Sequence, residues 1–359
     1  MKFSPEERQR LNIAIERLVQ KHKKMRKAHP ELKLGEAAAP APEGYVEDDP
    51  LRNCGNSEWQ KLIEPENSEL DKILLEYLAE IPKVPAEKMA KLTGDNTWVW
   101  GGPTPYWGGT MADDTLVRGA DYFNADNVVY VYGPTDDKMM TMHSKYKRML
   151  CQVNSQCRTP GAQNNFTGAT GKTADNLRTP GEKNFADAEN AEYLSKLSLQ
   201  YPNIAGAMCD DVSTYFEKIV LPEPFEARYK ALKKFNDKLR MYGVIYVHEL
   251  GTKDYSLIQP YMDVVNLWFW NKDEILEYDE NIELCRKNFP GKPILQGIFL
   301  HEYGRADSGN VPELLVYQLD KAREYIAKGI VEGVVLLGDR EIKKWPDVAA
   351  TLKNYLENQ

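Results

Sequence analysis

Eight short β-rich runs alternate with helix-like segments from Thr97 to the end of the chain. Strands separated by helices pair in parallel, because each helix carries the chain back to the starting edge of the sheet. Eight such units over about 260 residues predict a (β/α)8 TIM barrel. The runs are Thr97–Trp100, Asn127–Tyr132, Cys151–Arg158, Ile204–Asp210, Val244–Glu249, Val264–Trp270, Ile294–His301 and Gly333–Leu337.

A doubly wound open sheet is the alternative fold. It would need a phosphate-binding glycine turn after the first strand. The turn that follows Trp100 reads Gly-Gly-Pro-Thr-Pro, and its two prolines lack the amide donors that such a turn uses. The barrel is therefore the favoured fold.

The first ninety residues form a separate part of the pattern. Residues 4 to 28 predict an amphipathic helix with a stripe of Leu11, Ile15, Leu18 and His22. A linker rich in Ala, Pro and acidic residues follows, and then a second helix over 68–81. We expect residues 1–90 to be an N-terminal helical extension and linker, and residues 91–359 to be the barrel. The first helix would pack on the barrel or on a partner subunit, which makes a homo-oligomer possible.

Composition excludes several classes of function. The net charge is -8, and the basic residues concentrate only in the first thirty positions, so we expect no nucleic-acid partner. No apolar run reaches the roughly 18 residues of a membrane helix, and no signal peptide is visible, which predicts a cytoplasmic protein, or a secreted one whose signal was removed. Five scattered cysteines indicate neither a zinc module nor a disulfide framework, and we expect no cofactor.

Polar residues in mid-strand predict which side chains point into the barrel, because the outer face of each strand meets helices. On this rule the interior holds alternate residues of six strands: Trp98 and Trp100; Tyr130 and Tyr132; Gln152, Asn154, Gln156 and Arg158; Tyr246 and His248; Asn266, Trp268 and Trp270; Gln296, Ile298, Leu300 and Glu302. Val99, Val129, Phe299 and His301 would then face outward.

The run from Cys151 to Arg158 sets four hydrogen-bonding side chains on one face. It leads into a long connection, residues 159–184, rich in Gly, Asn and Thr. Connections of this length in compact domains are often binding loops. We expect Arg158, at the top of the row, to touch a ligand, and Gln152 to lie too deep to do so.

Active sites of such barrels form at the carboxyl ends of the strands. Aromatic rings, amides and charged groups gather there, which suits a carbohydrate, because sugar ring faces stack on aromatics and hydroxyls bond to polar groups. The predicted substrate-binding residues are Trp100, Tyr132, Asn154, Gln156, Arg158, Trp268, Trp270, Asn271, Tyr303 and Asp339. Tryptophan serving only as core filling is the alternative.

Two carboxylates across the mouth would meet the needs of glycoside hydrolysis. Asp210 or Asp211 after the fourth strand and Glu302 after the seventh are the candidates; alternatively these acids only cap helices or pair with arginines. His248 and Glu249 offer a second chemistry, that of a sugar isomerase or lyase, with or without a metal. No His-x-His or His-Glu-x-x-His spacing supports a metal, and we expect none. A non-catalytic sugar-binding barrel is the third possibility.

Three segments carry a resemblance to a known group of proteins: Tyr201–Asp211, Asp263–Asn271 and Ile294–Gly304. They look like the strand-end motifs of poorly characterised glycoside-hydrolase-like (β/α)8 barrels, over roughly residues 95 to 350. In the large retaining glycosidase clan with this fold, the acid/base follows strand four and the nucleophile follows strand seven. The resemblance therefore implies roles for Asp210 or Asp211 and for Glu302, although Asp-Asp stands here in place of the clan's Asn-Glu pair.

Overall fold

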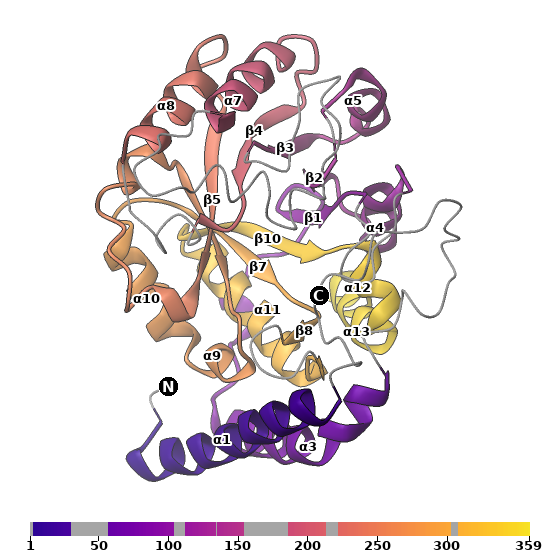
Figure 1. Ribbon diagram of the computed structural model, residues 1–359, viewed down its shortest axis with the longest axis vertical. Coiled ribbons are helices and arrows are strands. Elements are labelled where there is room, and N and C mark those ends of the chain that lie inside the picture. The colour runs from indigo at the N-terminus through magenta and orange to yellow at the C-terminus, as the bar shows by residue number, and fades with distance from the viewer. Residues whose placement is uncertain are drawn as a thin grey trace.

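The chain folds as a closed, eight-stranded parallel barrel surrounded by helices (Figure 1). The computed structural model describes residues 3–29, 57–103, 112–133, 135–153, 186–212, 222–302 and 308–359. The strands, in their order around the barrel, are β1 Thr97–Gly101, β2 Asn127–Tyr130, β3 Arg148–Gln152, β4 Ile204–Cys209, β5 Arg240–Tyr246, β6 Val264–Trp268, β7 Ile294–Ile298 and β10 Val331–Leu337. The prediction of a (β/α)8 barrel is confirmed.

Helices connect the strands and cover the outside of the barrel (Figure 1). They are α4 Thr115–Phe123, α5 Asp137–His143, α7 Ala186–Leu197, α8 Pro222–Lys233, α9 Lys272–Leu276, α10 Tyr278–Asn288, α11 Pro312–Ala327, α12 Asp339–Lys344 and α13 Pro346–Asn358. Short 3-10 turns lie at Ala86–Lys88 (η1), Val247–Glu249 (η4) and Gln259–Tyr261 (η5). Beyond β7, a two-residue strand β8, His301–Glu302, pairs antiparallel with β9, Ser308–Gly309.

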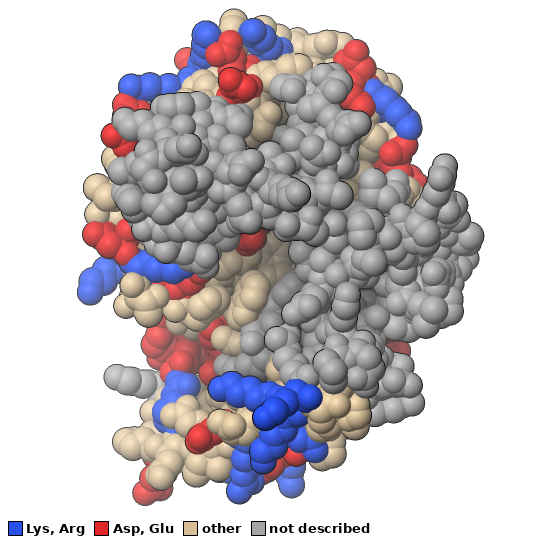
Figure 2. All heavy atoms as spheres, viewed as in Figure 1, with Lys and Arg blue, Asp and Glu red and all other residues tan. Residues whose placement is uncertain are grey.

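The N-terminal extension is a hairpin of two long helices, α1 Pro5–Ala28 and α3 Ser57–Glu80, which lies against α9 and α11 (Figure 1). Ser4 and Glu7 form a capping box that starts α1. Of the expected stripe, Leu11 and Leu18 are 0% exposed whereas Ile15 and His22 are half-buried, and α1 packs within the chain against α3. Lys and Arg side chains gather on the hairpin at the bottom of Figure 2, and three of those on α1, Arg10, Arg17 and Lys21, pair with acids of α3.

Strand register shows which residues face the interior, because paired residues of a parallel sheet point to the same side. A Cβ at Gly101 would meet Leu116 of α4 at 3.3 Å, so Gly101 faces outward and Trp100 faces inward. The pairings then place alternate residues inside, among them Trp98, Trp100, Asn127, Val129, Gln152, Tyr246, Asn266, Trp268 and Gly297. The predicted inward positions on β1, β3 and β6 are confirmed for the described strand residues, as is Tyr246 on β5.

The predicted orientations of β2 and β7 are wrong. Tyr130 faces outward and packs on His143 of α5, with ring centroids 5.0 Å apart, while Val129 points inside. Gln296 also faces outward, where its Oε1 accepts a 3.2 Å hydrogen bond from the Tyr278 hydroxyl of α10. Ile298 shares that face, and Phe299 lies instead beside the inward Trp268. The helical layer supplies polar partners here, which the rule did not allow for.

Most strands differ from the predicted runs by one to four residues at an end, and β3 and β5 differ at both ends. β3 begins three residues earlier than expected and ends at Gln152, so Asn154, Gln156 and Arg158 lie beyond the strand and outside the described residues. β5 ends at Tyr246, which leaves His248 and Glu249 in the turn η4. Both strands start with an arginine: Arg148 stacks over Trp98, and Arg240 pairs with Glu332 at 2.8 Å. These charged starts concealed the true beginnings of the strands.

Candidate active site

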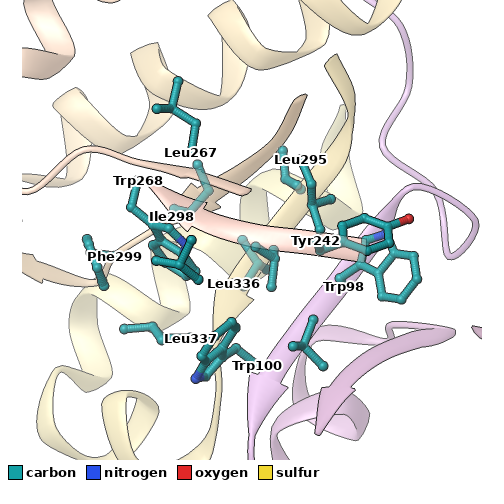
Figure 3. Packing of buried hydrophobic residues seen from close by; sticks show 14 of the residues in the cluster. Trp98, Trp100, Tyr242, Leu267, Trp268, Leu295, Ile298, Phe299, Leu336 and Leu337 are labelled. Atoms are coloured by element: carbon teal, nitrogen blue, oxygen red, sulfur yellow. The ribbon is translucent and has the colours of Figure 1, made fainter. Parts of the chain in front are cut away.

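A group of aromatic rings lines the carboxyl-terminal mouth of the barrel, and we call it the aromatic wall: Trp100, Tyr246, Trp268, Trp270 and Phe299. Trp100 meets Trp268 across the interior at 5.8 Å between ring centroids. Phe299 lies beside Trp268 (Figure 3), with 4.4 Å between the ring centroids, and the ring centroids of Trp270 and Tyr246 are 4.6 Å apart. Trp100, Trp268 and Phe299 are buried, whereas Tyr246 and Trp270 are partly exposed. The last two therefore offer the surface on which a ligand could stack.

The wall is held in place from below. Trp268 donates its indole N–H to Asn266 at 2.8 Å, and Asn266 in turn donates to the Leu295 carbonyl at 2.9 Å. The Trp268 indole lies over Gly297, where an added Cβ would come within 2.0 Å of that indole. A buried polar network that is bonded in this way restricts a side chain to one orientation. The sequence at β6 and β7 thus fixes where the wall stands.

The adjacent acids after β4 are arranged by an unusual backbone. Asp211 has a φ of 46°, in the left-handed region that L-residues rarely adopt. Its N–H donates to the Asp210 carboxylate at 3.0 Å, and its own Oδ1 accepts a 2.6 Å hydrogen bond from the Tyr246 hydroxyl. A regular strand could not aim both acids the same way, and this turn sets the Asp211 carboxylate beside the aromatic wall.

Glu302 lies in β8 and is only 1% exposed. Its Oε1 accepts a 3.2 Å hydrogen bond from the backbone N–H of Lys272, the first residue of α9. The same loop between β6 and α9 carries Trp270, which packs on Tyr246, the hydrogen-bond partner of Asp211. The segment from Trp270 to Lys272 therefore contacts Glu302 directly and contacts Tyr246, the hydrogen-bond partner of Asp211.

His248 and Glu249 diverge although they are neighbours in sequence. The His248 side chain is exposed, and its ring stacks beside Tyr246 with 5.8 Å between the centroids, at the edge of the aromatic wall. Glu249 turns away and accepts from the Lys253 ammonium at 2.9 Å and from the buried Tyr255 hydroxyl at 3.4 Å. The structure brings His248 together with the wall, and it places Glu249 in a separate ion pair.

Glu274 is a site residue that the sequence reasoning missed. Its Oε2 accepts the backbone N–H groups of Trp270 at 2.7 Å and Asn271 at 3.1 Å, and its Oε1 lies 4.0 Å from His248 Nδ1. Burial raises the pKa of Glu274 to about 7, and burial lowers the pKa of His248. The available signal was the pair Asn271-x-x-Glu274, a capping box that starts α9 and also positions Trp270.

The remaining predicted residues divide into placed and undescribed ones. Tyr132 is buried with a φ of 70°, and its N–H donates to Gln152 Oε1 at 2.9 Å. Gln152 is fully buried, in agreement with its expected depth. Asn271 caps α9, and Asp339 is the first residue of α12. Asn154, Gln156, Arg158 and Tyr303 lie outside the described residues.

The described residues offer neither a metal cluster nor a membrane-spanning helix. In the part of the chain that the structure describes, no three His, Cys, Asp or Glu side chains gather closely enough to hold a metal ion. Nor is any helix among the described residues long and apolar enough to cross a membrane. His301 and Glu341 do form a close buried pair, 2.5 Å from Nδ1 to Oε2, between β8 and α12.

Comparison with known proteins gives a likeness of fold to glycoside hydrolase barrels at low sequence identity. No family model matches the sequence, and no curated protein does. A GH2 beta-galacturonidase from Eisenbergiella tayi, solved with bound galacturonate, is 13% identical with a TM-score of 0.49, over 76% of this chain and 52% of that one. A family 18 chitinase from Crocus vernus is 13% identical with a TM-score of 0.41, over 73% and 96%. A beta-D-glucuronidase from Dictyoglomus thermophilum is 11% identical with a TM-score of 0.46, over 74% and 50%.

Proposed function

We propose that this barrel binds a carbohydrate at its carboxyl-terminal mouth and hydrolyses a glycosidic bond there. The observation that carries the proposal is the Asp211 carboxylate, bonded to Tyr246 at 2.6 Å beside the partly exposed ring of Trp270. A carboxylate next to an aromatic surface suits a sugar-cleaving site. The sugar ring is held by stacking on the aromatic side chain while the carboxylate reaches the glycosidic bond.

In this proposal the two working carboxylates are Asp211 and Glu302. The hydroxyl of Tyr246 donates to Oδ1 of Asp211 and orients this carboxylate, which in the proposal acts as base or nucleophile. Glu302, 1% exposed, is held by the Lys272 N–H, and water is excluded around it. Whether products retain configuration depends on the separation of the two carboxyl groups when sugar is bound.

A panel of 4-nitrophenyl glycosides with neutral, N-acetylated and acidic sugars tests the proposal. Asp211→Asn and Glu302→Gln should each abolish release of 4-nitrophenol from the sugar that the native protein cleaves, while sugar binding persists in calorimetry. Asp237→Asn is the matched control, because Asp237 is exposed just before β5, at the opposite end of the barrel. Full turnover in Glu302→Gln or Asp211→Asn would overturn the hydrolase assignment, and binding without turnover in the native protein would point to a sugar-binding barrel.

One observation favours a second candidate, a proton transfer on a sugar as in an isomerase or lyase. The His248 ring borders the aromatic wall, and the carboxyl that approaches it is Glu274, at 4.0 Å, with a pKa raised by burial to about 7. A group that titrates near neutral pH can both take and return a proton. His248→Gln would then remove turnover of free sugars, whereas it would leave glycoside cleavage by the two carboxylates largely intact.

A further inference from the structure

The hairpin of α1 and α3 reaches the barrel through a lysine that is completely buried. The side chain of Lys272 is 0% exposed, and its ammonium donates to Asp71 of α3 at 2.7 Å and to Asn67 at 3.4 Å. Asn67 also donates its side-chain amide to the other oxygen of Asp71, at 3.3 Å. Three residues thus form a closed polar contact between the extension and the first residue of α9.

The backbone of the same lysine touches the candidate site. The Lys272 N–H donates to Glu302 Oε1 at 3.2 Å. A backbone N–H that bonds a carboxylate moves with the residue that carries it. The position of the Glu302 carboxylate is therefore tied to the side-chain anchor of Lys272 on α3.

A second contact holds the other end of this segment. Arg8 of α1 bonds to Glu277, the residue that ends α9, and lies 3.8 Å from Asp273. Since α9 spans only Lys272–Leu276, the hairpin contacts it at both of its ends. Short helices gain little stability by themselves, so their position comes from such tertiary contacts.

The full burial of Lys272 restricts the geometry of its pair with Asp71, whose side chain is 22% exposed. Burial raises the pKa of Asp71, and the Lys272 charge lowers it, so the carboxylate and the ammonium depend on each other. Exposed pairs elsewhere on the hairpin, such as Arg17 with Glu69, can separate into water at little cost. Neither Asp71 nor Lys272 can do so without leaving a buried charge uncompensated.

We propose that Asp71 is a positioning residue for the candidate active site, which it serves by fixing Lys272 and, through its N–H, the Glu302 carboxylate. The inference rests on the proposed function, in which Glu302 is a working carboxylate. It gives the N-terminal hairpin a role in the chemistry, although the hairpin contributes no group that touches the substrate.

Hydrogen exchange and kinetics on the full chain test the proposal together. Asp71→Ala should speed amide exchange in residues 272–276 at least roughly tenfold. It should also lower kcat about 10- to 100-fold, with KM nearly unchanged, on the glycoside whose cleavage depends on Glu302. Asp71→Asn keeps the shape and one acceptor, and should restore part of both losses. Glu69→Gln, on the same helix, is the matched control and should change neither quantity.

The outcomes separate this inference from the proposed function. Native exchange in residues 272–276 for both Asp71→Ala and Lys272→Met would overturn the positioning role, whether or not any glycoside is cleaved. Faster exchange with native kcat would overturn it as well. If Asp71→Ala fails to fold, Asp71→Asn decides by the same two measurements. If no glycoside is cleaved, hydrogen exchange still decides whether Asp71 fixes residues 272–276, and only the assignment as a hydrolase is overturned.

Discussion

The hydroxyl of Tyr246 lies 2.6 Å from Oδ1 of Asp211, and it joins the end of β5 to the strained turn after β4. Residues held in the left-handed region cost about 1–3 kcal/mol, and such costs concentrate at functional sites. Tyr246 supplies one of the bonds that hold Asp211 in this conformation. The pair therefore links the aromatic wall to a candidate catalytic carboxylate.

Removal of that hydroxyl should affect turnover more than stability. We expect Tyr246→Phe to lower kcat/KM on a cleaved glycoside by about 10- to 100-fold, because Asp211 loses its orienting donor. The free energy of unfolding should fall by only about 1 kcal/mol. Tyr229→Phe is the control. The Tyr229 hydroxyl donates to Asp263 over 2.8 Å, and this pair does not lie at the mouth. An equal kinetic effect in both variants would contradict the role of Tyr246.

A methyl group at Gly297 should displace the aromatic wall. The added Cβ would lie 2.0 Å from the Trp268 indole, so Gly297→Ala must shift that ring, at a cost of about 1–3 kcal/mol in urea unfolding. Tryptophan fluorescence should change as Trp268 leaves Trp100 and Phe299. Gly251→Ala meets nothing within 4 Å and should leave both the spectrum and the stability near native values. Sugar binding should weaken in Gly297→Ala alone.

The strained Tyr132 depends on a buried acceptor. Gln152→Met removes the oxygen that accepts the Tyr132 N–H, and a buried unsatisfied donor costs about 1–3 kcal/mol. Thermal unfolding should report this loss, with far-UV circular dichroism unchanged. Gln200→Met, in the exposed turn that follows α7, should stay within about 0.5 kcal/mol of the native protein. A stable Gln152→Met protein would mean that the Tyr132 turn needs no such partner.

Glu274 should make stability fall as the pH rises. Burial raises the pKa of Glu274 to about 7 from the model-compound value of 4.5, so the folded state binds more protons than the unfolded state between these values. The contribution is fully present below pH 4.5 and is lost by about pH 7, with a size of a few kcal/mol. Urea unfolding of native protein and Glu274→Gln at several pH values measures it. The difference between them should grow through this window, and a constant difference would contradict the assignment.

The barrel could be predicted because eight runs and their intervening helices leave few other folds. Side-chain direction was predictable only where burial and polarity agreed, as for Trp100 and Gln152. It failed for Gln296 and Tyr130, because residues on α10 and α5 supply partners for them outside the barrel. No local pattern announces contacts of that kind.

The candidate site was predicted in part. Asp211 and Trp270 lie at the mouth with Tyr246, whereas Glu249 joins Lys253 instead. Glu274 was missed because an acid in the first turn of a helix is typical of a helix cap. Its contact with His248 could not be predicted either, because His248 follows another strand. The contact between Asp71 and Lys272 spans 201 positions in sequence, and no spacing rule reaches that far.

The buried lysine also bears on how the molecule unfolds. Loss of the Asp71 carboxylate while the hairpin stays in place would leave the Lys272 ammonium buried without its charged partner, at a cost of several kcal/mol. The hairpin is joined to the barrel by this pair and by packing on α9 and α11, so the two parts should lose their structure together, in one cooperative calorimetric transition. A chain shortened to the barrel would lose the Asp71 partner of Lys272 and would uncover the parts of α9 and α11 on which the hairpin packs, so the extension contributes to the integrity of the barrel.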